Sequence, residues 1–322
     1  MLLTRPILAF TRKINCIDHP KDEGHKTHTR PTPLAGGLII ASLLLIIILG
    51  KPELFTGDLA YILGGGLLIG AAGFIDDLYG LRARWKLLGQ VIGISVLLLG
   101  KVHVHIFSTE FLNYAITFFW ILGITNAFNL IDGLDGLATG LASIACALIA
   151  FCCIGSGQLQ LAFVATTLLA SVSWLYYLNI MPAKLFLGDA GSQMLGFIIA
   201  TLLIAYHPPG FSIAHYWFLP VMFMGVIIFD TTLVVLSRLF NHQAIYLGNR
   251  DHTHHRLVHT GMSPNRAALT IHLVSAAVSI LGFVAVESTP LTGNLIFTAT
   301  CSTGLGIIFF LNRKQIKALI SK

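Results

Sequence analysis

Long apolar runs alternate with short polar loops from about residue 34 to the end of the chain. A helix needs about 20 mostly apolar residues to cross a hydrocarbon core of about 30 Å. Such runs predict ten full transmembrane helices, at residues 34–50, 58–75, 86–100, 111–128, 136–155, 159–179, 192–206, 216–237, 267–286 and 291–311. The pattern therefore predicts an all-α fold, a polytopic integral membrane helical bundle.

A shorter apolar segment, "MLLTRPILAF", precedes these runs. It is too short to cross the membrane unaided, so we expect either the tail of a first helix or a helix lying in the membrane interface. It counts as a partial N-terminal helix. Because a polytopic bundle packs as one body, we predict a single membrane-embedded domain over residues 1–322.

Composition agrees with a membrane protein. The chain is 55% hydrophobic and 11% charged, with a mean hydropathy of +0.81, whereas soluble proteins carry about 25% charged residues. The net charge of +6 reflects basic loops that set topology, so we expect no nucleic-acid partner. The five cysteines form no CxxC pair, and we interpret them as packing residues.

Basic residues divide the loops into two sets. If successive loops alternate across the membrane, one set holds all 20 Lys and Arg residues except Arg5, Lys51 and Lys101. The positive-inside rule makes that face cytoplasmic. The same face collects Asp76, Asp77, Asn126, Asn129, Asp132, Asp135, Asp189, His252, His254 and His255. This one-sided collection predicts a single site at the cytoplasmic boundary of the membrane.

Two adjacent carboxylates, Asp76 and Asp77, end an apolar run in "GFIDDLYGLRARWK". Acidic side chains at a helix C-terminus oppose the helix dipole. A bound cation is one reason for them to be there, and a solvated helix end is the alternative.

The stretch "NAFNLIDGLDG" places Asn126, Asn129 and Asp132 at three-residue intervals. They share one face if the helix persists that far. Gly133 and Gly136 favour a break, where backbone can approach a ligand closely. Hydrogen bonding between helices would explain one Asn, but it explains two Asn, two Asp and the glycines poorly.

In "KLFLGDAGSQ", Asp189 lies between Gly188 and Gly191, directly before an apolar run. A ligand site and a plain turn, with Ser192 capping the following helix, are equally compatible with this stretch alone. Phe186 fits either a core position or a platform for stacking.

The stretch "GNRDHTHHRLVH" carries His252, His254, His255 and His259. Zinc is one hypothesis, but the spacing lacks the separated pair of a structural zinc site and no Cys is near. Arg250 and Arg256 flank the histidines, and both residue types bind phosphate. An anion-binding loop therefore fits better.

Asp230 lies late in the run 216–237. A carboxylate inside a membrane span indicates a functional site by default. Pairing with Arg238, eight residues on, is the alternative.

These motifs indicate one kind of chemistry. Asp and Asn oxygens suit Mg²⁺ or Mn²⁺, and the basic and histidine loops suit phosphates. A site at the membrane boundary suits a substrate with an anionic head and an apolar tail. Together they predict metal-assisted phosphoryl transfer between a soluble nucleotide and a membrane lipid phosphate.

Five stretches in this order, "RPTPLAGG", "DDLYGLRARWK", "NAFNLIDGLDGLATG", "FLGDAGS" and "HTHH", resemble the polyprenyl-phosphate N-acetylhexosamine-1-phosphate transferases of glycosyltransferase family 4. The resemblance covers nearly the whole chain. One branch of the family consists of the phospho-N-acetylmuramoyl-pentapeptide transferases, with three consecutive histidines. "HTHH", and its spacing from Asp230 and Arg238, instead resemble the undecaprenyl-phosphate N-acetylglucosamine-1-phosphate transferases.

The resemblance implies a role for each motif residue. It implies catalytic roles for Asp76, Asp77, Asp189, His254 and His255. It implies metal contacts from Asp189, Asn129 and Asp77, with Mg²⁺ as the cofactor and Mn²⁺ as its substitute. It implies substrate contacts from Lys86, Asn126, Asp132, Asp135, Phe186, Arg238, Arg250 and His252, with Asp135 at the uracil and Phe186 stacked on it. Asn126 and Asp132 are either ligands themselves or supports for Asn129 and Asp135.

The implied reaction transfers N-acetylglucosamine 1-phosphate from a UDP-sugar to undecaprenyl phosphate and releases UMP. This is the first membrane step of a cell-envelope polysaccharide. The resemblance implies a multi-pass protein of the bacterial inner (plasma) membrane with its active site facing the cytoplasm. Its partners would be a UDP-N-acetyl sugar, undecaprenyl phosphate and the lipid bilayer. The sugar, the polysaccharide and the oligomeric state, including a homodimer, stay open.

Three alternatives remain. One is a phospho-N-acetylmuramoyl-pentapeptide transferase. Another, of a different class, is a divalent-cation or proton-coupled transporter, although carriers place their site near the bilayer midplane and these acids end their spans. A lipid-binding scaffold would not need the five motifs. Within the enzyme hypothesis, Asp76 is either a base or a positioning group; a phosphate monoester is roughly 90% ionised at pH 7, which favours positioning.

Overall fold

The computed structural model describes residues 2–20, 30–54, 56–241, 243 and 251–313. Contacts within the chain form two compact units, Met1–Gly210 and Phe211–Lys322. The single domain expected from the sequence stays a prediction.

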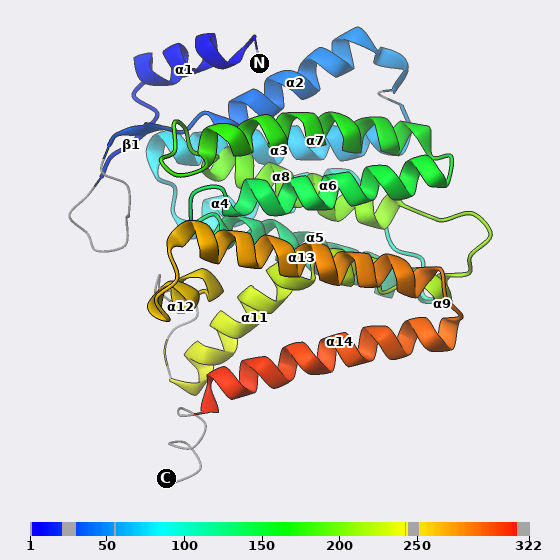
Figure 1. Ribbon diagram of the computed structural model, residues 1–322. Helices are drawn as coiled ribbons and strands as arrows, with labels where there is room; N and C mark the ends of the chain where they lie inside the picture. Colours follow the sequence, from blue (N-terminus) through cyan, green and yellow to red (C-terminus); the bar gives the residue numbers. More distant parts are fainter. Residues whose placement is uncertain (1, 21–29, 55, 242, 244–250, 314–322) are drawn as a thin grey trace. The chain divides into compact units, whose positions relative to one another are not determined.

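The first unit is a helical bundle with one short β-ribbon (Figure 1). Its elements are α1 (Thr4–Lys13), β1 (Ile17–Asp18), β2 (Thr32–Pro33), α2 (Gly36–Gly50), the short 3-10 helix η1 (Pro52–Leu54), α3 (Asp58–Tyr79), α4 (Ala83–Leu99), α5 (Glu110–Ile131), α6 (Leu137–Gly155), α7 (Leu159–Asn179) and α8 (Gly188–Ala205). β1 and β2 pair antiparallel, with Ile17 opposite Pro33. The leading apolar segment forms α1, which Trp174 on α7 holds by donating a hydrogen bond to Thr4 Oγ1 at 2.9 Å.

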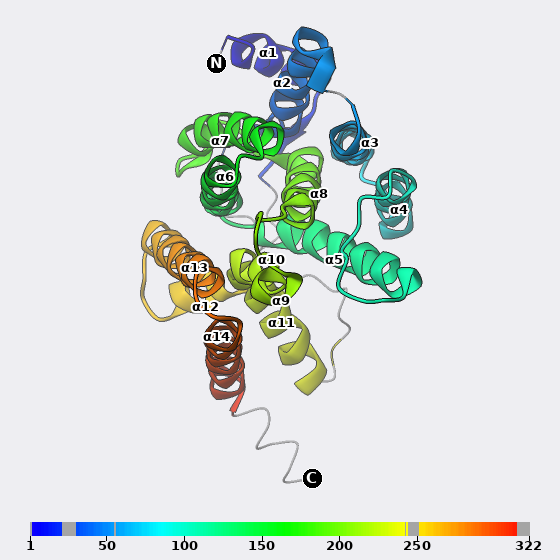
Figure 2. The ribbon, with the colours of Figure 1, turned by 90° about the vertical axis from the view of Figure 1, so that its right-hand side faces the viewer.

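Helix α8 is the centre of this unit. Every residue from 190 to 204 is buried, as expected for a helix that is surrounded by others. It packs against α3 and α5 most extensively, and also against α2, α6 and α7. Figure 2 looks along these helices and shows α8 between the α6–α7 pair and α3.

Glycine lets the end of α3 meet the start of α8. A Cβ atom on Gly73 would lie 2.7 Å from the Ala190 backbone and 2.7 Å from the carbonyl carbon of Asp189. Only a residue without a side chain permits this approach. As a result, the carboxylates that follow Gly73 on α3 lie beside the first turn of α8.

The second unit contains α9 (Ile213–Tyr216), α10 (Leu219–Phe223), α11 (Gly225–Phe240), α12 (Thr253–His259), α13 (Pro264–Val286) and α14 (Pro290–Leu311). The two long helices begin with a proline in the first turn and a capping hydroxyl before it. Ser263 Oγ accepts from the Arg266 N–H and Thr289 Oγ1 from the Thr292 N–H. These are the stabilising partners for the unpaired donors of a helix start.

The all-α, multi-pass membrane prediction is confirmed, and each of the ten predicted runs coincides with helix. Within the described ranges, seven helices are long and apolar enough to cross a membrane, or eight if one bent pair counts as a single span. That pair covers the predicted run 216–237 and bends by 63° between Phe223 and Gly225. α2 is apolar but shorter, so ten crossings stay a prediction.

Candidate active site

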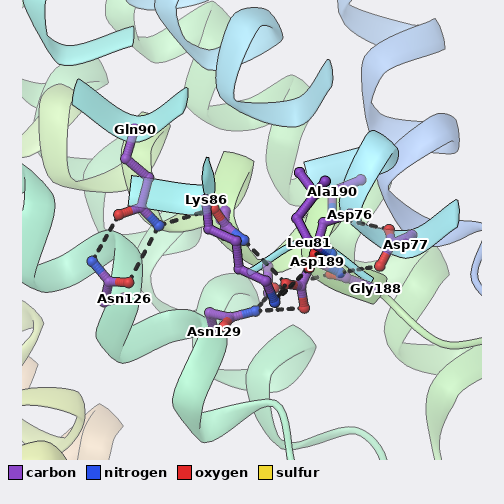
Figure 3. A network of polar contacts seen from close by, with 12 residues as sticks. Asp76, Asp77, Leu81, Lys86, Gln90, Asn126, Asn129, Gly188, Asp189 and Ala190 are labelled. Atoms are coloured by element: carbon purple, nitrogen blue, oxygen red, sulfur yellow. Dashed lines mark hydrogen bonds and ion pairs between the residues drawn. The ribbon is translucent and has the colours of Figure 1, made fainter. Parts of the chain in front are cut away.

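The end of α3 faces the start of α8 through Asp77. Its Oδ1 accepts from the Asp189 N–H at 2.7 Å and its Oδ2 from the Ala190 N–H at 3.1 Å (Figure 3). A carboxylate beside the unpaired N–H groups of a helix start is favourable. Asp77 opposes the dipole of its own helix, α3, and the N-terminus of α8 compensates for this cost.

Gly188 makes this contact possible. Its φ of +73° is a left-handed conformation, and a Cβ there would lie 2.6 Å from Asp77 Oδ2. Glycine adopts this conformation without steric cost. The first turn of α8 can therefore receive the Asp77 carboxylate directly.

Asp76 points to a different set of partners. It is buried, and its Oδ1 accepts from the Leu81 N–H at 2.5 Å, across the α3–α4 turn. Its Oδ2 lies 2.5 Å from Lys86 Nζ, and the same ammonium lies 2.6 Å from Asp189 Oδ2. Lys86 on α4 thus bridges carboxylates of α3 and α8, as Figure 3 shows.

Asn129 on α5 holds the other oxygen of Asp189. Its Nδ2 donates to Asp189 Oδ1 at 2.9 Å and to Ser192 Oγ at 2.9 Å. The Ser192 hydroxyl donates in turn to the Gly188 carbonyl. Both amide hydrogens are used, so the carbonyl oxygen of Asn129 is the group left to meet a ligand.

The donor set fits a hard divalent cation in its chemistry. Three carboxylates and one ammonium leave a formal charge of −2 when all are ionised, and the oxygens of Asp76, Asp189 and Asn129 are those that Mg²⁺ prefers. Among the described residues, however, no group of three His, Cys, Asp or Glu side chains is spaced to hold a metal ion. Mg²⁺ commonly uses one or two carboxylates with water and phosphate, so Asp189 and Asn129 suffice for such a site. Asp77, with both oxygens on backbone N–H groups, acts here as a helix cap.

Asn126 lies one turn deeper than Asn129. Its Nδ2 donates to Gln90 Oε1 at 2.9 Å and to the Leu122 carbonyl at 2.8 Å, and its Oδ1 accepts from Gln90 Nε2 at 3.2 Å. Asn126 was predicted to contact substrate, and these bonds support the alternative of hydrogen bonding between helices.

Gln90, together with Gln193, was missed in the sequence. The available signal was spacing, because Gln90 follows Lys86, and Gln193 follows Asp189, by four residues in apolar helices.

Two loops beside this cluster carry the residues predicted to contact the nucleotide. Asn179 joins the loops, since its Oδ1 accepts from the Gly136 N–H and its Nδ2 donates to the Leu185 carbonyl, each at 3.0 Å. The Ala183 N–H also approaches Asp135 Oδ2 at 3.4 Å. Asp135 and the partly exposed Phe186 are therefore carried by neighbouring loops.

Asp132 follows the last residue of α5. Burial, and then the negative charges of Asp189, Asp77 and Asp135, raise the pKa of its carboxyl well above the usual range.

In the second unit, Asp230 on α11 holds the start of α12. Its Oδ2 lies 2.8 Å from His252 Nδ1, and its Oδ1 accepts from the Thr253 N–H at 2.6 Å. Among the described residues, Asp230 therefore meets His252 and the Thr253 backbone N–H, and its pairing with Arg238 stays a prediction. A carboxylate on Nδ1 fixes the orientation of an imidazole and leaves Nε2 for another partner.

His254 is buried beside this pair, 2% exposed. Its ring stacks on His252 and lies 4.1 Å, between centroids, from the ring of His255. Neither nitrogen has a hydrogen-bond partner within the described residues. Burial, and then the neighbouring histidines, lower the pKa of His254 to about 4. A neutral imidazole with unpaired nitrogens can bind a ligand group.

The structure describes two of the three arginines that the sequence analysis singled out near these histidines. Arg256 donates from NH2 to Ser237 Oγ at 3.0 Å and to Asn312 Oδ1 at 3.4 Å, and so ties α12 to its neighbours. Arg238 is buried. Arg250 lies outside the described residues. That this histidine cluster meets the Asp189 cluster in one site stays a prediction from the sequence.

Comparison with known proteins places these residues in context. The sequence pattern of "Glycosyl transferase family 4" matches residues 59–207. A probable undecaprenyl-phosphate N-acetylglucosaminyl 1-phosphate transferase of Bacillus subtilis is 33% identical over 90% of this chain and 82% of its own length. A phospho-N-acetylmuramoyl-pentapeptide-transferase of the same organism is 28% identical over 88% and 93%. A decaprenyl-phosphate N-acetylglucosaminephosphotransferase of Mycobacterium leprae is 26% identical over 95% and 86%.

Proposed function

The chain belongs to glycosyl transferase family 4, and from this premise we propose that it transfers N-acetylglucosamine 1-phosphate from UDP-N-acetylglucosamine to undecaprenyl phosphate. The lipid phosphate oxygen attacks the phosphorus next to the sugar, the bond to UMP breaks, and an undecaprenyl-diphosphate sugar forms. The observation that carries the proposal is the convergence of Asp76, Lys86, Asn129 and Asp189 from four helices.

Lys86 supplies positive charge where phosphates would react. Two carboxylates bind its ammonium group, and these contacts fix the position of the positive charge. Catalysis of phosphoryl transfer depends chiefly on positioning and on neutralising charge. A lysine held in this way is suited to meet a phosphate oxygen.

We assign Mg²⁺ to Asp189 and the Asn129 carbonyl oxygen, with Mn²⁺ as its substitute. When bound, the ion neutralises the diphosphate and assists departure of UMP. Different donors hold the two oxygens of Asp189, with Asn129 on Oδ1 and Lys86 on Oδ2. EDTA should abolish transfer and added Mg²⁺ should restore it; unchanged turnover in EDTA would remove the metal from the account.

We propose that Asp76 positions its neighbours and does not deprotonate the acceptor phosphate. Both of its oxygens already bind donors, the Leu81 N–H and the Lys86 ammonium. The acceptor phosphate is mostly ionised near pH 7, so a base would have little proton to remove. Asp76 therefore fixes the α3–α4 turn and the ammonium that α4 carries.

The nucleotide is assigned to the loops joined by Asn179. Asp135 and Phe186 lie on these loops, and they offer a carboxylate for the uracil and an aromatic face for stacking. We further propose that this site faces the cytoplasm at a bacterial inner membrane, an orientation that the excess of Lys and Arg in its loops supports.

A substrate panel tests the proposal. Purified protein would be incubated with undecaprenyl phosphate and, separately, UDP-N-acetylglucosamine, UDP-N-acetylgalactosamine and UDP-N-acetylmuramoyl-pentapeptide. UDP-N-acetylglucosamine should give a lipid-linked sugar and an equal amount of UMP. A product with the pentapeptide alone would move the chain to the other branch, and no product with any of them would contradict a transferase.

A further inference from the structure

A second polar layer lies beneath the Lys86–Asp189–Asn129 cluster. It consists of Gln90, Gln193 and Asn126, from the same three helices α4, α8 and α5. Gln90 and Gln193 are each 2% exposed. Each member follows or precedes a member of the upper layer by three or four residues, which is one helical turn. Figure 3 shows Gln90 and Asn126 paired to the left of Lys86 and Asn129.

Hydrogen bonds connect the three amides of this layer. Asn126 Nδ2 donates to the Leu122 carbonyl and to Gln90 Oε1. Gln90 Nε2 donates to Asn126 Oδ1 and, at 2.9 Å, to Gln193 Oε1. Gln193 Nε2 then reaches Asp189 Oδ2 at 3.3 Å. The three amides thus connect a backbone carbonyl of α5 to the central carboxylate of the site.

The backbone carbonyl of Leu122 sets the orientation of all three amides. A carbonyl oxygen only accepts, so Asn126 must turn its NH₂ group toward Leu122. Gln90 must then present its oxygen to that NH₂ group and its own NH₂ group to Gln193. Turning any one amide around would oppose two oxygens or two NH₂ groups at a buried contact, which is costly. Gln193 is therefore locked with an N–H, rather than an oxygen, toward Asp189.

We propose that Gln90 is a positioning residue for the transfer reaction, which acts on Asp189 through the amide of Gln193. This inference rests on the proposed function, because Gln90 affects turnover only through Asp189. Groups that hold a ligating carboxylate from behind typically change metal affinity or activity by about 10-fold to 100-fold when removed. The competing explanation is that the amides only hold α4, α5 and α8 together.

Kinetics of Gln90→Met, Gln193→Met and the double variant separate these explanations, because Met keeps the shape of Gln and removes its hydrogen bonds. Each single variant should lower kcat by about 10-fold or more, with KM for UDP-N-acetylglucosamine within about threefold. The double variant should be no slower than the slower single variant, since one path is cut in both.

Asn113→Leu is the matched control. Asn113 is another buried amide of α5, bonded to Ile106 and Phe107, about 20 Å along the helix from Asn126. Its loss should lower the unfolding temperature and leave kcat unchanged. If Gln90→Met behaves like Asn113→Leu, or if the Gln90 and Gln193 effects multiply, the positioning role is wrong.

A second readout does not depend on turnover. The dissociation constant of Mn²⁺, measured by electron paramagnetic resonance, should rise about 10-fold in Gln90→Met. If the wild-type protein turns over but binds no Mn²⁺, the metal assignment fails and kcat alone decides on Gln90. If it binds Mn²⁺ but transfers no sugar phosphate, the proposed function fails, and the Mn²⁺ affinity of Gln90→Met alone tests whether Gln90 positions Asp189. If the wild-type protein neither binds Mn²⁺ nor transfers sugar phosphate, both proposals are wrong.

Asn126→Leu replaces Gln90→Met if that variant does not fold. It cuts the same chain at its far end, next to Leu122, and should lower kcat with KM unchanged. A raised KM with unchanged kcat would instead make Asn126 a substrate contact and contradict the proposal.

Discussion

Lys86 Nζ lies 2.6 Å from Asp189 Oδ2 and 2.5 Å from Asp76 Oδ2. One ammonium therefore separates two carboxylates that come from different helices and would otherwise repel. The position between two carboxylates is also one that a divalent cation favours. A cation bound as proposed would therefore act on the same negative charge as Lys86.

Replacing Lys86 by Met should reveal this shared role. Transfer should fall by about 100-fold or more, because a positioned cationic donor to the reacting phosphates is lost. The unfolding temperature should fall in metal-free buffer, because Asp76 and Asp189 lose their counter-charge. Added Mg²⁺ should raise the unfolding temperature more in the variant than in the wild type.

Lys51→Met is the control for a lost lysine. Lys51 is exposed and lies 3.5 Å from the equally exposed Glu53, and such pairs contribute little. Its variant should keep wild-type stability and activity. An identical Mg²⁺ response in Lys86→Met and in the wild type would show that Lys86 and the cation act on different charges.

Gly188→Ala should disconnect α3 from α8. Alanine is strained at a φ of +73°, and its Cβ would lie 2.6 Å from Asp77 Oδ2, so the carboxylate must leave the helix start. We expect loss of transfer together with a lower unfolding temperature. Gly157→Ala isolates the strain, because Gly157 has a φ of +71° with nothing within 4 Å of its added Cβ. It should be mildly destabilised and fully active; equal activity in both variants would contradict the Asp77 contact.

His254 should make folding stability depend on pH. Its pKa is lowered from 6.5 to about 4 in the folded chain, so on acidification the unfolded chain takes up the proton first. Stability should therefore fall as the pH drops from about 6.5 toward 4, by about 2 kcal/mol at pH 5. Thermal unfolding at pH 7.5 and pH 5.0 measures this. His254→Phe should show a smaller loss, and an equal loss in both proteins would remove His254 as its cause.

Asp76→Asn distinguishes a base from a positioning group. Asn keeps one acceptor oxygen but loses the charge that faces Lys86, so we expect turnover to stay low at every pH. The measurement is a pH–rate profile between about pH 6 and pH 9.5. Recovery toward the wild-type rate at high pH, where no base is needed, would make Asp76 the base.

The sequence predicted the helices well because hydrophobic length is a local signal. The bend near Met224 was missed because the run 216–237 was interpreted by its hydrophobic length alone, although Pro220 and Gly225 flank the bend. The sequence predicted that Asp76, Lys86, Asn129 and Asp189 belong to a single site, but it did not predict which of their atoms bond. Their bonds depend on the packing of four helices, which no local pattern contains.

Asp77 shows most clearly what the local sequence could not predict. Its partners are backbone N–H groups that lie 112 and 113 residues further along the chain. Local sequence showed a carboxylate at an unfavourable helix end, and a cation was the available explanation. Gln90 and Gln193 were missed for a related reason, because single amides in apolar helices are weak signals until their partners are known.

Transfer of a phosphorus label tests the central claim most directly. UDP-N-acetylglucosamine labelled with ³²P in the β-phosphate would be incubated with undecaprenyl phosphate and either the wild-type protein or Asp189→Asn. The account predicts that the label moves to the lipid with the wild-type protein, that UMP leaves unlabelled, and that the folded Asp189→Asn variant transfers none. Label that stays in the nucleotide while sugar reaches the lipid, or full transfer by Asp189→Asn, would contradict it.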